Sequence, residues 1–133
     1  PDGSEQMPET GVTIPSHASA LGKVLLAFNA DHARAVLGRE LRALSSDTVT
    51  DPKILRAQFA DVRRTTLGEE VEEALIGECS LAAPIFGHAG DVVAAVAIVI
   101  PSSEWPVSSK NANDLLEAAR NISRELGGGW PPV

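Results

Sequence analysis

Apolar residues recur at intervals of three and four in several segments of the chain, which is the spacing of one helix face. The first such segment follows Pro15, and Ser16 is placed to be its N-cap. Its predicted apolar face consists of Ala18, Leu21, Leu25 and Phe28. Gly22 lies in the middle of this helix, where it costs about 1 kcal/mol relative to alanine. We therefore expect another part of the molecule to approach the backbone closely at Gly22.

Three further helices are predicted downstream. A short one is capped by Asp31 and ends at Gly38. The next begins at Asp51 and Pro52, a cap followed by the residue that suits a first helical turn, and runs to about Thr65. A last helix ends at the glycines of 127–129. The apolar stripes of the two longer helices are predicted to be Ile54, Leu55, Phe59 and Val62, and Leu115, Ala119, Ile122 and Leu126.

Two apolar runs, 79–86 and 92–100, predict strands joined by a glycine-containing loop in an antiparallel hairpin. Because the run 92–100 contains no polar residue, we expect its strand to be central and buried on both faces. A solvated acidic turn is predicted between Gly68 and the first strand, with five glutamates, Glu69, Glu70, Glu72, Glu73 and Glu78. The sum is an α+β domain, with helices packed on a small antiparallel sheet.

Composition limits the number of domains, the partners and the cellular location that this chain can have. Its 133 residues suit one domain, and a net charge of -7 with dispersed basic residues disfavours direct binding to a DNA backbone. The longest apolar run is under half of the roughly 20 residues that a membrane helix needs. A single cysteine excludes an internal disulfide and favours a cytoplasmic location. Because the chain begins without an initiator methionine, we interpret it as a fragment of a longer polypeptide.

Candidate chemistry is sparse. A hydrolase or transferase could use Cys79 or Ser80 with His17 or His88, but no nucleophile signature surrounds them, so no catalytic residue is assigned. The three histidines fall on different elements, and neither phosphate-binding glycine motif occurs, so no metal or cofactor is expected. The first turn of the first helix, with the amides of residues 18–21, remains as a place where a carboxylate could dock.

Several segments in this order resemble motifs of one known family. They are Pro15–Ala27 (PLHATALGKALLA in the family), Thr48–Asp51 (T-x-T-D), Val62–Thr65 (V-R-x-x-G), Glu72–Phe86 (E-E, then C-I-A-A-P-V-F), Val92–Val96 (V-V-A-A-L) and Ile122–Gly127. The chain thus resembles the effector-binding domain of IclR-type transcriptional regulators. The resemblance implies a GAF-like domain over 11–127, followed by a tail at 128–133. The polar composition of residues 1–10, with proline and glycine, predicts a flexible lead-in before it. The resemblance also implies that the usual first helix and first strands of the domain are missing.

The resemblance further implies a function. A small-molecule effector, commonly an organic or aromatic carboxylate, would control DNA binding by an N-terminal winged helix-turn-helix absent from this sequence. It implies a homodimer or tetramer for the full-length protein, and no enzymatic activity or membrane association. Carried over by position, the effector-binding residues are Ile14, Ser19, Ala20, Leu21, Gly22, Glu70, Glu78, Ser80, Ala97 and Val99.

Two of these positions depart from relatives that bind small oxo-acids, which have serines where this chain has Ala97 and Val99. A buried polar atom left without a partner costs about 1 to 3 kcal/mol. We therefore expect a larger ligand with an apolar body rather than glyoxylate or pyruvate. Glu78 could either repel an anion or accept a hydrogen bond from a ligand hydroxyl. A third hypothesis is a ligand-free oligomerisation module, in which the space between Leu21, Ser80 and Val99 is sealed.

Overall fold

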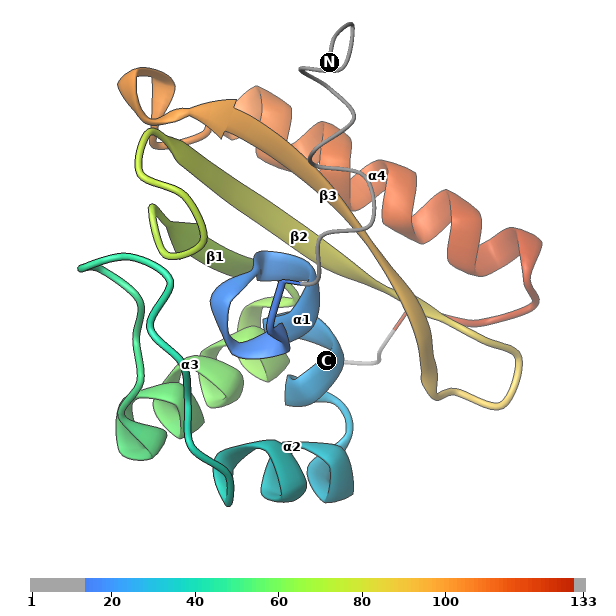
Figure 1. The fold of residues 1–133 in the computed structure, drawn as a ribbon. Coiled ribbons are helices and arrows are strands. Elements are labelled where there is room, and N and C mark those ends of the chain that lie inside the picture. Colours follow the sequence, from blue (N-terminus) through green and yellow to red (C-terminus); the bar gives the residue numbers. More distant parts are fainter. Residues whose placement is uncertain (1–13, 131–133) are drawn as a thin grey trace, which may run out of the picture.

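A computed structural model describes residues 14–130, so the expected lead-in at 1–10 and the last three residues of the tail lie outside the described residues. Helices α1 (Ala20–Ala27), α2 (Ala30–Leu37) and α3 (Pro52–Thr65) precede strands β1 (Gly68–Val71), β2 (Glu78–Phe86) and β3 (Val92–Pro101), and helix α4 (Ser109–Glu125) follows (Figure 1). Short 3-10 helices, η2 (Ser16–Ala18) and η3 (Ser102–Glu104), precede α1 and follow β3. The predicted α+β class is confirmed.

The three strands form one antiparallel sheet in the order β1-β2-β3. The β2–β3 hairpin is confirmed, but the prediction that the second strand is central is wrong. β2 is central and buried along almost all of its length, whereas β3 lies at the edge of the sheet described here, with Val99 62% exposed. An apolar run indicates that a strand packs against other parts of the protein, but it does not reveal whether a further strand pairs with its second edge. β1 itself lies where only an acidic turn was predicted.

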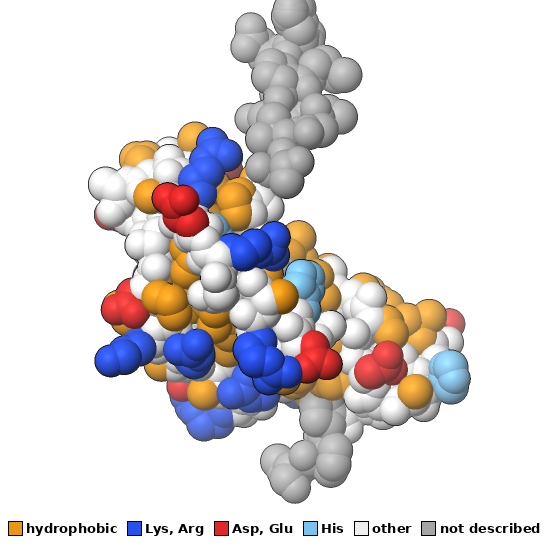
Figure 2. Space-filling view, turned by 60° about the horizontal axis from the view of Figure 1, so that its bottom comes forward, with side chains coloured by type: hydrophobic (Ala, Val, Ile, Leu, Met, Phe, Trp, Pro, Cys, Tyr) orange, Lys and Arg blue, Asp and Glu red, His pale blue; other side chains and the backbone are white. Residues whose placement is uncertain are grey.

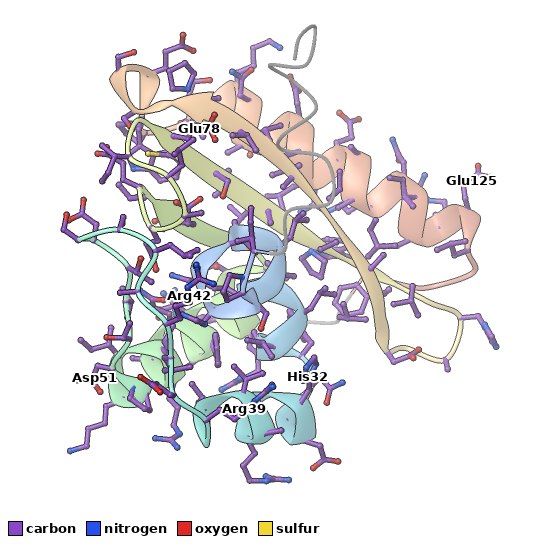
Figure 3. The ribbon with its side chains drawn as sticks, in the orientation of Figure 1. His32, Arg39, Arg42, Asp51, Glu78 and Glu125 are labelled. Atoms are coloured by element: carbon purple, nitrogen blue, oxygen red, sulfur yellow. The ribbon has the colours of Figure 1, made fainter. Side chains whose placement is uncertain are left out.

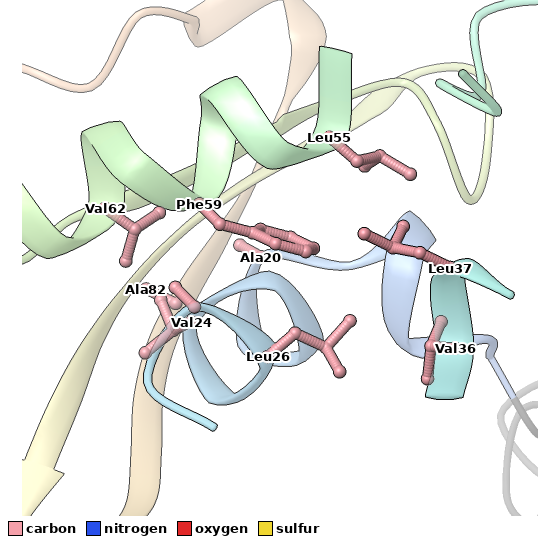
Figure 4. Packing of buried hydrophobic residues seen from close by; sticks show 10 residues of the cluster. Ala20, Val24, Leu26, Val36, Leu37, Leu55, Phe59, Val62 and Ala82 are labelled. Carbon is pink, nitrogen blue, oxygen red and sulfur yellow. The ribbon is translucent and has the colours of Figure 1, made fainter. Parts of the chain in front are cut away.

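Helices cover both faces of the sheet (Figure 1). α1 lies on one face with α2 and α3 packed around it, and α4 crosses the other face. Ala82 of β2 joins the core under the first three helices, where it packs near Val24 and Phe59 (Figure 4). Its neighbours Leu81 and Ala83 join the core under α4, because successive side chains of a strand point to opposite faces.

The first two helices begin at different caps from those predicted. Residues 16–18 form η2, so α1 is capped by Ser19, whose Oγ accepts from the Gly22 amide at 3.0 Å. α2 is capped by Asn29 rather than Asp31, since Asn29 Oδ1 accepts from the His32 amide at 3.0 Å. Each predicted cap lies two or three residues from another side chain that can accept the same kind of hydrogen bond.

The predicted face of α1 is also wrong. Leu21 and Leu25 are 42% and 39% exposed, and the buried side contains Ala20, Val24 and Ala27. These three residues are also spaced by four and three, so the periodicity alone fits both faces. The small side chain of Ala20 allows α1 to lie close to the sheet.

The two longer helices follow the sequence prediction more closely. α3 has the predicted cap at Asp51 and the predicted end at Thr65, although Ile54 is 50% exposed instead of buried. In α4, Ile122 is likewise 39% exposed, and the buried residue beside it is Ser123. Ser123 Oγ donates to the Ala119 carbonyl and accepts from the Phe86 amide, which secures the end of the sheet to α4.

The expected tail begins with residues that pack on the domain. Gly127 ends α4 with φ +81°, as predicted for a terminal glycine, although Leu126 before it is 49% exposed. Trp130 then lies edge-on to Phe86, with ring centroids 5.4 Å apart, and Arg120 lies over the Trp130 ring. No helix within 14–130 combines the length and apolar character needed to span a bilayer.

Candidate functional site

The sheet residues predicted to bind an effector share one face. Glu70 lies opposite Ser80, and Ser80 lies opposite Val99, so the three form a row across β1, β2 and β3. Alternate residues of a strand point the same way, which adds Glu78 and Ala97 to this face. Helix α1 covers part of the same face, with Ala20 and Ala97 packed in one cluster. We call this side of the sheet the α1 face; it carries Glu70, Glu78, Ser80, Ala97 and Val99.

The N-terminal end of α1 provides backbone donors beside this face. The Gly22 amide is bonded to Ser19 Oγ and the Lys23 amide to the Ser19 carbonyl. The Ala20 and Leu21 amides belong to the first turn, where backbone amides have no carbonyl acceptor within the helix. The Ala18 amide, in contrast, donates to the Pro15 carbonyl at 3.0 Å, so it does not belong to the predicted set of open donors.

Gly22 meets another part of the chain, as expected. A Cβ at this position would lie 2.1 Å from the Ser16 carbonyl oxygen, which is far too close. The glycine therefore allows η2 to fold back against α1. The structure places this contact within the protein, and it accounts for Gly22 without a ligand.

Glu70 and Glu73 are buried, contrary to the prediction of a wholly solvated acidic segment. Their residues are only 5% and 4% exposed. Glu70 Oε1 accepts from Ser80 Oγ at 2.8 Å, and Glu70 Oε2 accepts from the Glu73 amide at 2.7 Å. These bonds satisfy the buried carboxylate, and they commit the Ser80 proton to Glu70. Glu78, at the start of β2, remains exposed (Figure 3).

Lys23 is the buried cation that sequence reasoning missed. It is 1% exposed, and its Nζ donates to Glu73 Oε2 at 2.6 Å and to Gln58 Oε1 at 2.8 Å. Glu73 Oε1 also accepts from the Val49 amide, which ties the segment before α3 to the β1–β2 turn. A lysine inside the apolar run of residues 20–28 was the available signal, because a charge on a packed helix needs a partner.

Three of the apolar side chains predicted to bind an effector are exposed to solvent. Ile14, Leu21 and Val99 are 49%, 42% and 62% exposed, whereas Ser80 is only 6% exposed, so the ligand-free hypothesis stays open. Ala20 is fully buried, backbone included, so Leu21 is the exposed residue of the first turn of α1. A groove of about 460 Å³ between β3 and α4 includes Ala97 and Val99 but neither Leu21 nor Ser80.

The catalytic alternative receives no geometric support. Cys79 pairs with Ile100 and Ser80 with Val99, so the two side chains point to opposite faces of the sheet. Cys79 Sγ contacts Ser102 Oγ at 3.6 Å, and Ser80 Oγ donates to Glu70. His17 Nε2 is bonded to the Arg42 carbonyl at 2.8 Å, so this ring nitrogen is already engaged. Over residues 14–130, side chains of histidine, cysteine, aspartate and glutamate form no group suited to a metal ion.

Comparison with known proteins gives this arrangement a context. Residues 2–126 match the family model described as the bacterial transcriptional regulator IclR C-terminal domain. The HTH-type transcriptional regulator TtgV of Pseudomonas putida is 36% identical over 121 residues, covering 88% of this chain and 45% of TtgV. The glycerol operon regulatory protein of Streptomyces griseus is 32% identical, covering 97% of this chain and 52% of that protein. The chain thus spans about half the length of these relatives.

Solved structures agree with the sequence comparison. The C-terminal domain of Escherichia coli KdgR superposes with a TM-score of 0.73 at 32% identity, covering 85% of this chain and 71% of that one. An IclR homologue from Microbacterium hydrocarbonoxydans complexed with 4-hydroxybenzoate gives a TM-score of 0.77 at 31% identity. That superposition covers 85% of this chain and 46% of the homologue.

Proposed function

Because this chain belongs to the IclR family, as the C-terminal effector-binding domain of a transcriptional regulator, we propose that it senses an organic acid with an apolar body on the α1 face. The observation that carries the proposal is the joint position of α1 and the row Glu70–Ser80–Val99. The first turn of α1, a polar row and exposed apolar side chains lie on one side of the sheet.

The ligand carboxylate is assigned to the first turn of α1. The Ala20 and Leu21 amides lie at the positive end of the helix dipole, which favours an anion. The apolar body of the ligand would lie against Leu21 and Val99, whose side chains are exposed. Ala97 and Val99 offer no hydroxyl, which argues against small oxo-acids whose polar atoms would lack partners.

The sheet side of the site offers acceptors. Since Ser80 gives its proton to Glu70, its oxygen can only accept from a ligand, and the Glu78 carboxylate also accepts. A ligand hydroxyl at this end would find a partner. 4-Hydroxybenzoate, which is bound by the Microbacterium homologue, combines a carboxylate, an apolar ring and a hydroxyl, so it is the first compound to try.

In the full-length regulator, ligand binding would shift a population between two arrangements and change operator affinity through an N-terminal winged helix-turn-helix. We further propose that this regulator is cytoplasmic, is not an enzyme and acts as a homodimer or tetramer. The support for a regulator rather than an enzyme is that relatives such as TtgV and the glycerol operon protein are named as regulators.

A thermal-shift panel tests the proposed ligand class. It contains benzoate, 4-hydroxybenzoate, 4-methoxybenzoate, octanoate, glyoxylate and pyruvate. A ligand at 100 times its Kd adds about 2.7 kcal/mol to the free energy of unfolding. We expect a selective rise in Tm with the apolar acids, greatest for 4-hydroxybenzoate. Stabilisation by glyoxylate or pyruvate alone would contradict the assigned class, and a flat panel would contradict sensing of these acids by this chain.

Substitution locates the site. Leu21→Trp and Val99→Trp should fill the proposed space and abolish the shift, because both side chains are exposed at its margin. Val93→Trp is the matched control, since Val93 is a second valine of β3 and is 52% exposed. A normal ligand response in both test variants would place the site elsewhere.

A further inference from the structure

A pocket between η2 and the segment that follows α2 carries polar groups that the proposed effector site does not use. Its volume is about 220 Å³. The lining comes from two segments of the chain, 15–17 and 39–42, together with Val36. None of these residues belongs to the α1 face, so the pocket is distinct from the proposed effector site. We call it the arginine pocket, because its lining includes Arg39 and Arg42.

His17 is a buried polar side chain in this lining, and only one of its two ring nitrogens is hydrogen-bonded. The residue is 3% exposed. Its Nε2 lies 2.8 Å from the Arg42 carbonyl oxygen, which can only accept, so Nε2 carries the proton of the neutral ring. Nδ1 has no hydrogen-bond partner among residues 14–130. Because buried polar atoms are usually paired, this nitrogen indicates a polar occupant of the pocket.

Two arginines of the lining are open to an anion. Arg39 Nε donates to the Ala35 carbonyl at 3.3 Å, which leaves the two terminal nitrogens of this side chain available. Neither Arg39 nor Arg42 forms an ion pair within the described part of the chain. In Figure 3 Arg42 lies beside η2, in agreement with the bond between its carbonyl and His17. Glu40 is the one acid among the described residues of the lining, so the arginines outnumber it.

The pocket belongs to the most basic part of an acidic chain. Residues 30–65 contain seven of the eleven lysines and arginines but five of the eighteen acidic residues. This segment is therefore net positive, although the chain has a net charge of -7. Figure 2 shows lysine and arginine side chains gathered on the side of the molecule that α2 and α3 form. Such a local excess of positive charge raises the concentration of anions near the pocket.

We propose that the arginine pocket binds a phosphate group, either as free phosphate or as part of a small phosphomonoester. The guanidinium groups of Arg39 and Arg42 donate charge-assisted hydrogen bonds, and their planar arrangement of N–H groups matches phosphate oxygens. The Ser16 hydroxyl, which has no partner among the described residues, donates to a further oxygen. His17 Nδ1 accepts from a P–OH group or, when the ring is protonated, donates to an oxygen.

The size and the donors of the pocket favour a phosphate over a carboxylate. Its volume is below the roughly 300 Å³ at which typical small-ligand pockets begin, so it suits a compact group. A carboxylate offers two oxygens, whereas a phosphate group offers three acceptor oxygens, which two guanidinium groups and a hydroxyl can share. Because the pocket has no lining residue in common with the α1 face, this site is independent of the proposed sensing function.

An NMR titration of the whole ¹⁵N-labelled chain with inorganic phosphate and with methyl phosphate tests the site. Sodium chloride at equal ionic strength is the reference for general salt effects. We expect saturable shifts at the amides of residues 16–17 and 39–42. Arg39→Gln and Arg42→Gln should each weaken binding about tenfold, because each removes a charge-assisted contact. Arg56→Gln is the matched control, since Arg56 is an exposed arginine of α3 outside this pocket.

The two probes also distinguish the sources of the phosphate group. Tighter binding of methyl phosphate supports a phosphomonoester, and binding of inorganic phosphate that is equal or tighter supports free phosphate. Circular dichroism of each variant separates lost binding from lost folding. Shifts that sodium chloride reproduces, or binding that Arg56→Gln weakens as much as Arg39→Gln and Arg42→Gln do, would indicate an adventitious ion only and overturn the proposal. The absence of saturable shifts with both probes would overturn it as well.

Discussion

The two faces of the sheet are built with different chemistry. Under α4 the core is apolar, with Leu81 and Ala83 packed against Leu115 and Ala119. Beneath α1, in contrast, Lys23 and Glu73 form an ion pair whose side chains are only 1% and 6% exposed. The α4 side keeps its own lysine–carboxylate pair, Lys110–Asp114, in solvent. The same kind of ion pair therefore lies inside the protein on one side and outside it on the other.

This difference indicates different tasks for the two faces. A buried ion pair is weak evidence for added stability, because desolvation of the charges offsets their attraction. The hydrogen bonds around Lys23 do fix the positions of the site residues. Lys23 donates to Glu73, the Glu73 amide donates to the Glu70 carboxylate, and this carboxylate also accepts from Ser80 Oγ. We therefore interpret the α4 face as the side that stabilises the fold, and the α1 face as the side that positions the site.

Breaking the buried pair should have the largest effect. Lys23→Met leaves the Glu73 carboxylate buried with its ammonium partner removed, which is expected to lower the free energy of unfolding by about 3–5 kcal/mol. Urea denaturation measures this loss. The double variant Lys23→Met/Glu73→Leu should recover a good part of it. A single variant as stable as the wild type would show that the pair carries no such role.

A cavity in the α4 core should cost somewhat less and leave the site intact. Leu81 is 3% exposed, and Leu81→Ala is expected to lower the free energy of unfolding by about 3 kcal/mol through lost burial and an unfilled cavity. The ligand-induced increase in Tm should persist. If the ligand response disappears while the variant is folded, the division of tasks between the faces is wrong.

Removing the Ser80 hydroxyl should have a moderate effect. Ser80→Ala takes away the donor to Glu70 Oε1, and a buried acceptor left unpaired costs about 1–3 kcal/mol. On our assignment, the preference for 4-hydroxybenzoate over benzoate should also shrink, because an acceptor for the ligand hydroxyl is lost. Calorimetric titration of both compounds measures this. Ser123→Ala, a buried serine on the α4 side, should lower stability without changing the preference.

The exposed ion pair Lys110–Asp114 should contribute least to the stability of the fold. The hydrogen bond and charge of Asp114 raise the pKa of Lys110, so the small stabilisation is present at neutral pH and is lost as pH rises through the raised pKa. Asp114→Asn should return the Lys110 pKa toward its ordinary value in an NMR titration, with no resolvable change in urea midpoint. A clear loss of stability in Asp114→Asn would contradict the expected difference between the exposed Lys110–Asp114 pair and the buried Lys23–Glu73 pair.

The elements with distinctive terminal signals could be predicted from sequence. Asp51-Pro52 marked the start of α3, and Gly127 marked the end of α4. Signals that occur more than once within a few residues failed, as with Ser16 and Ser19 before α1. Strand order was inaccessible because β1 is a four-residue strand with two glutamates, a composition that favours a turn.

The site could be predicted only in part. Family resemblance brought Glu70, Ser80 and Val99 together, and the strand register places them in one row. Burial of Glu70 was missed because a run of glutamates looks solvated, and the neighbours that satisfy it, Ser80 and the Glu73 amide, depend on the fold. The pairing of Lys23 with Glu73 spans fifty residues, which local sequence patterns cannot link.

An NMR titration tests the central claim most directly. Uniformly ¹⁵N-labelled protein would be titrated with 4-hydroxybenzoate while the backbone amide shifts are followed. We predict saturable shifts at Ala20, Leu21, Ser80 and Val99, with the amides of α4 largely unchanged. Shifts confined to α4 and its groove with β3, or no saturable shift at any amide, would contradict the assignment of the α1 face as the sensing site.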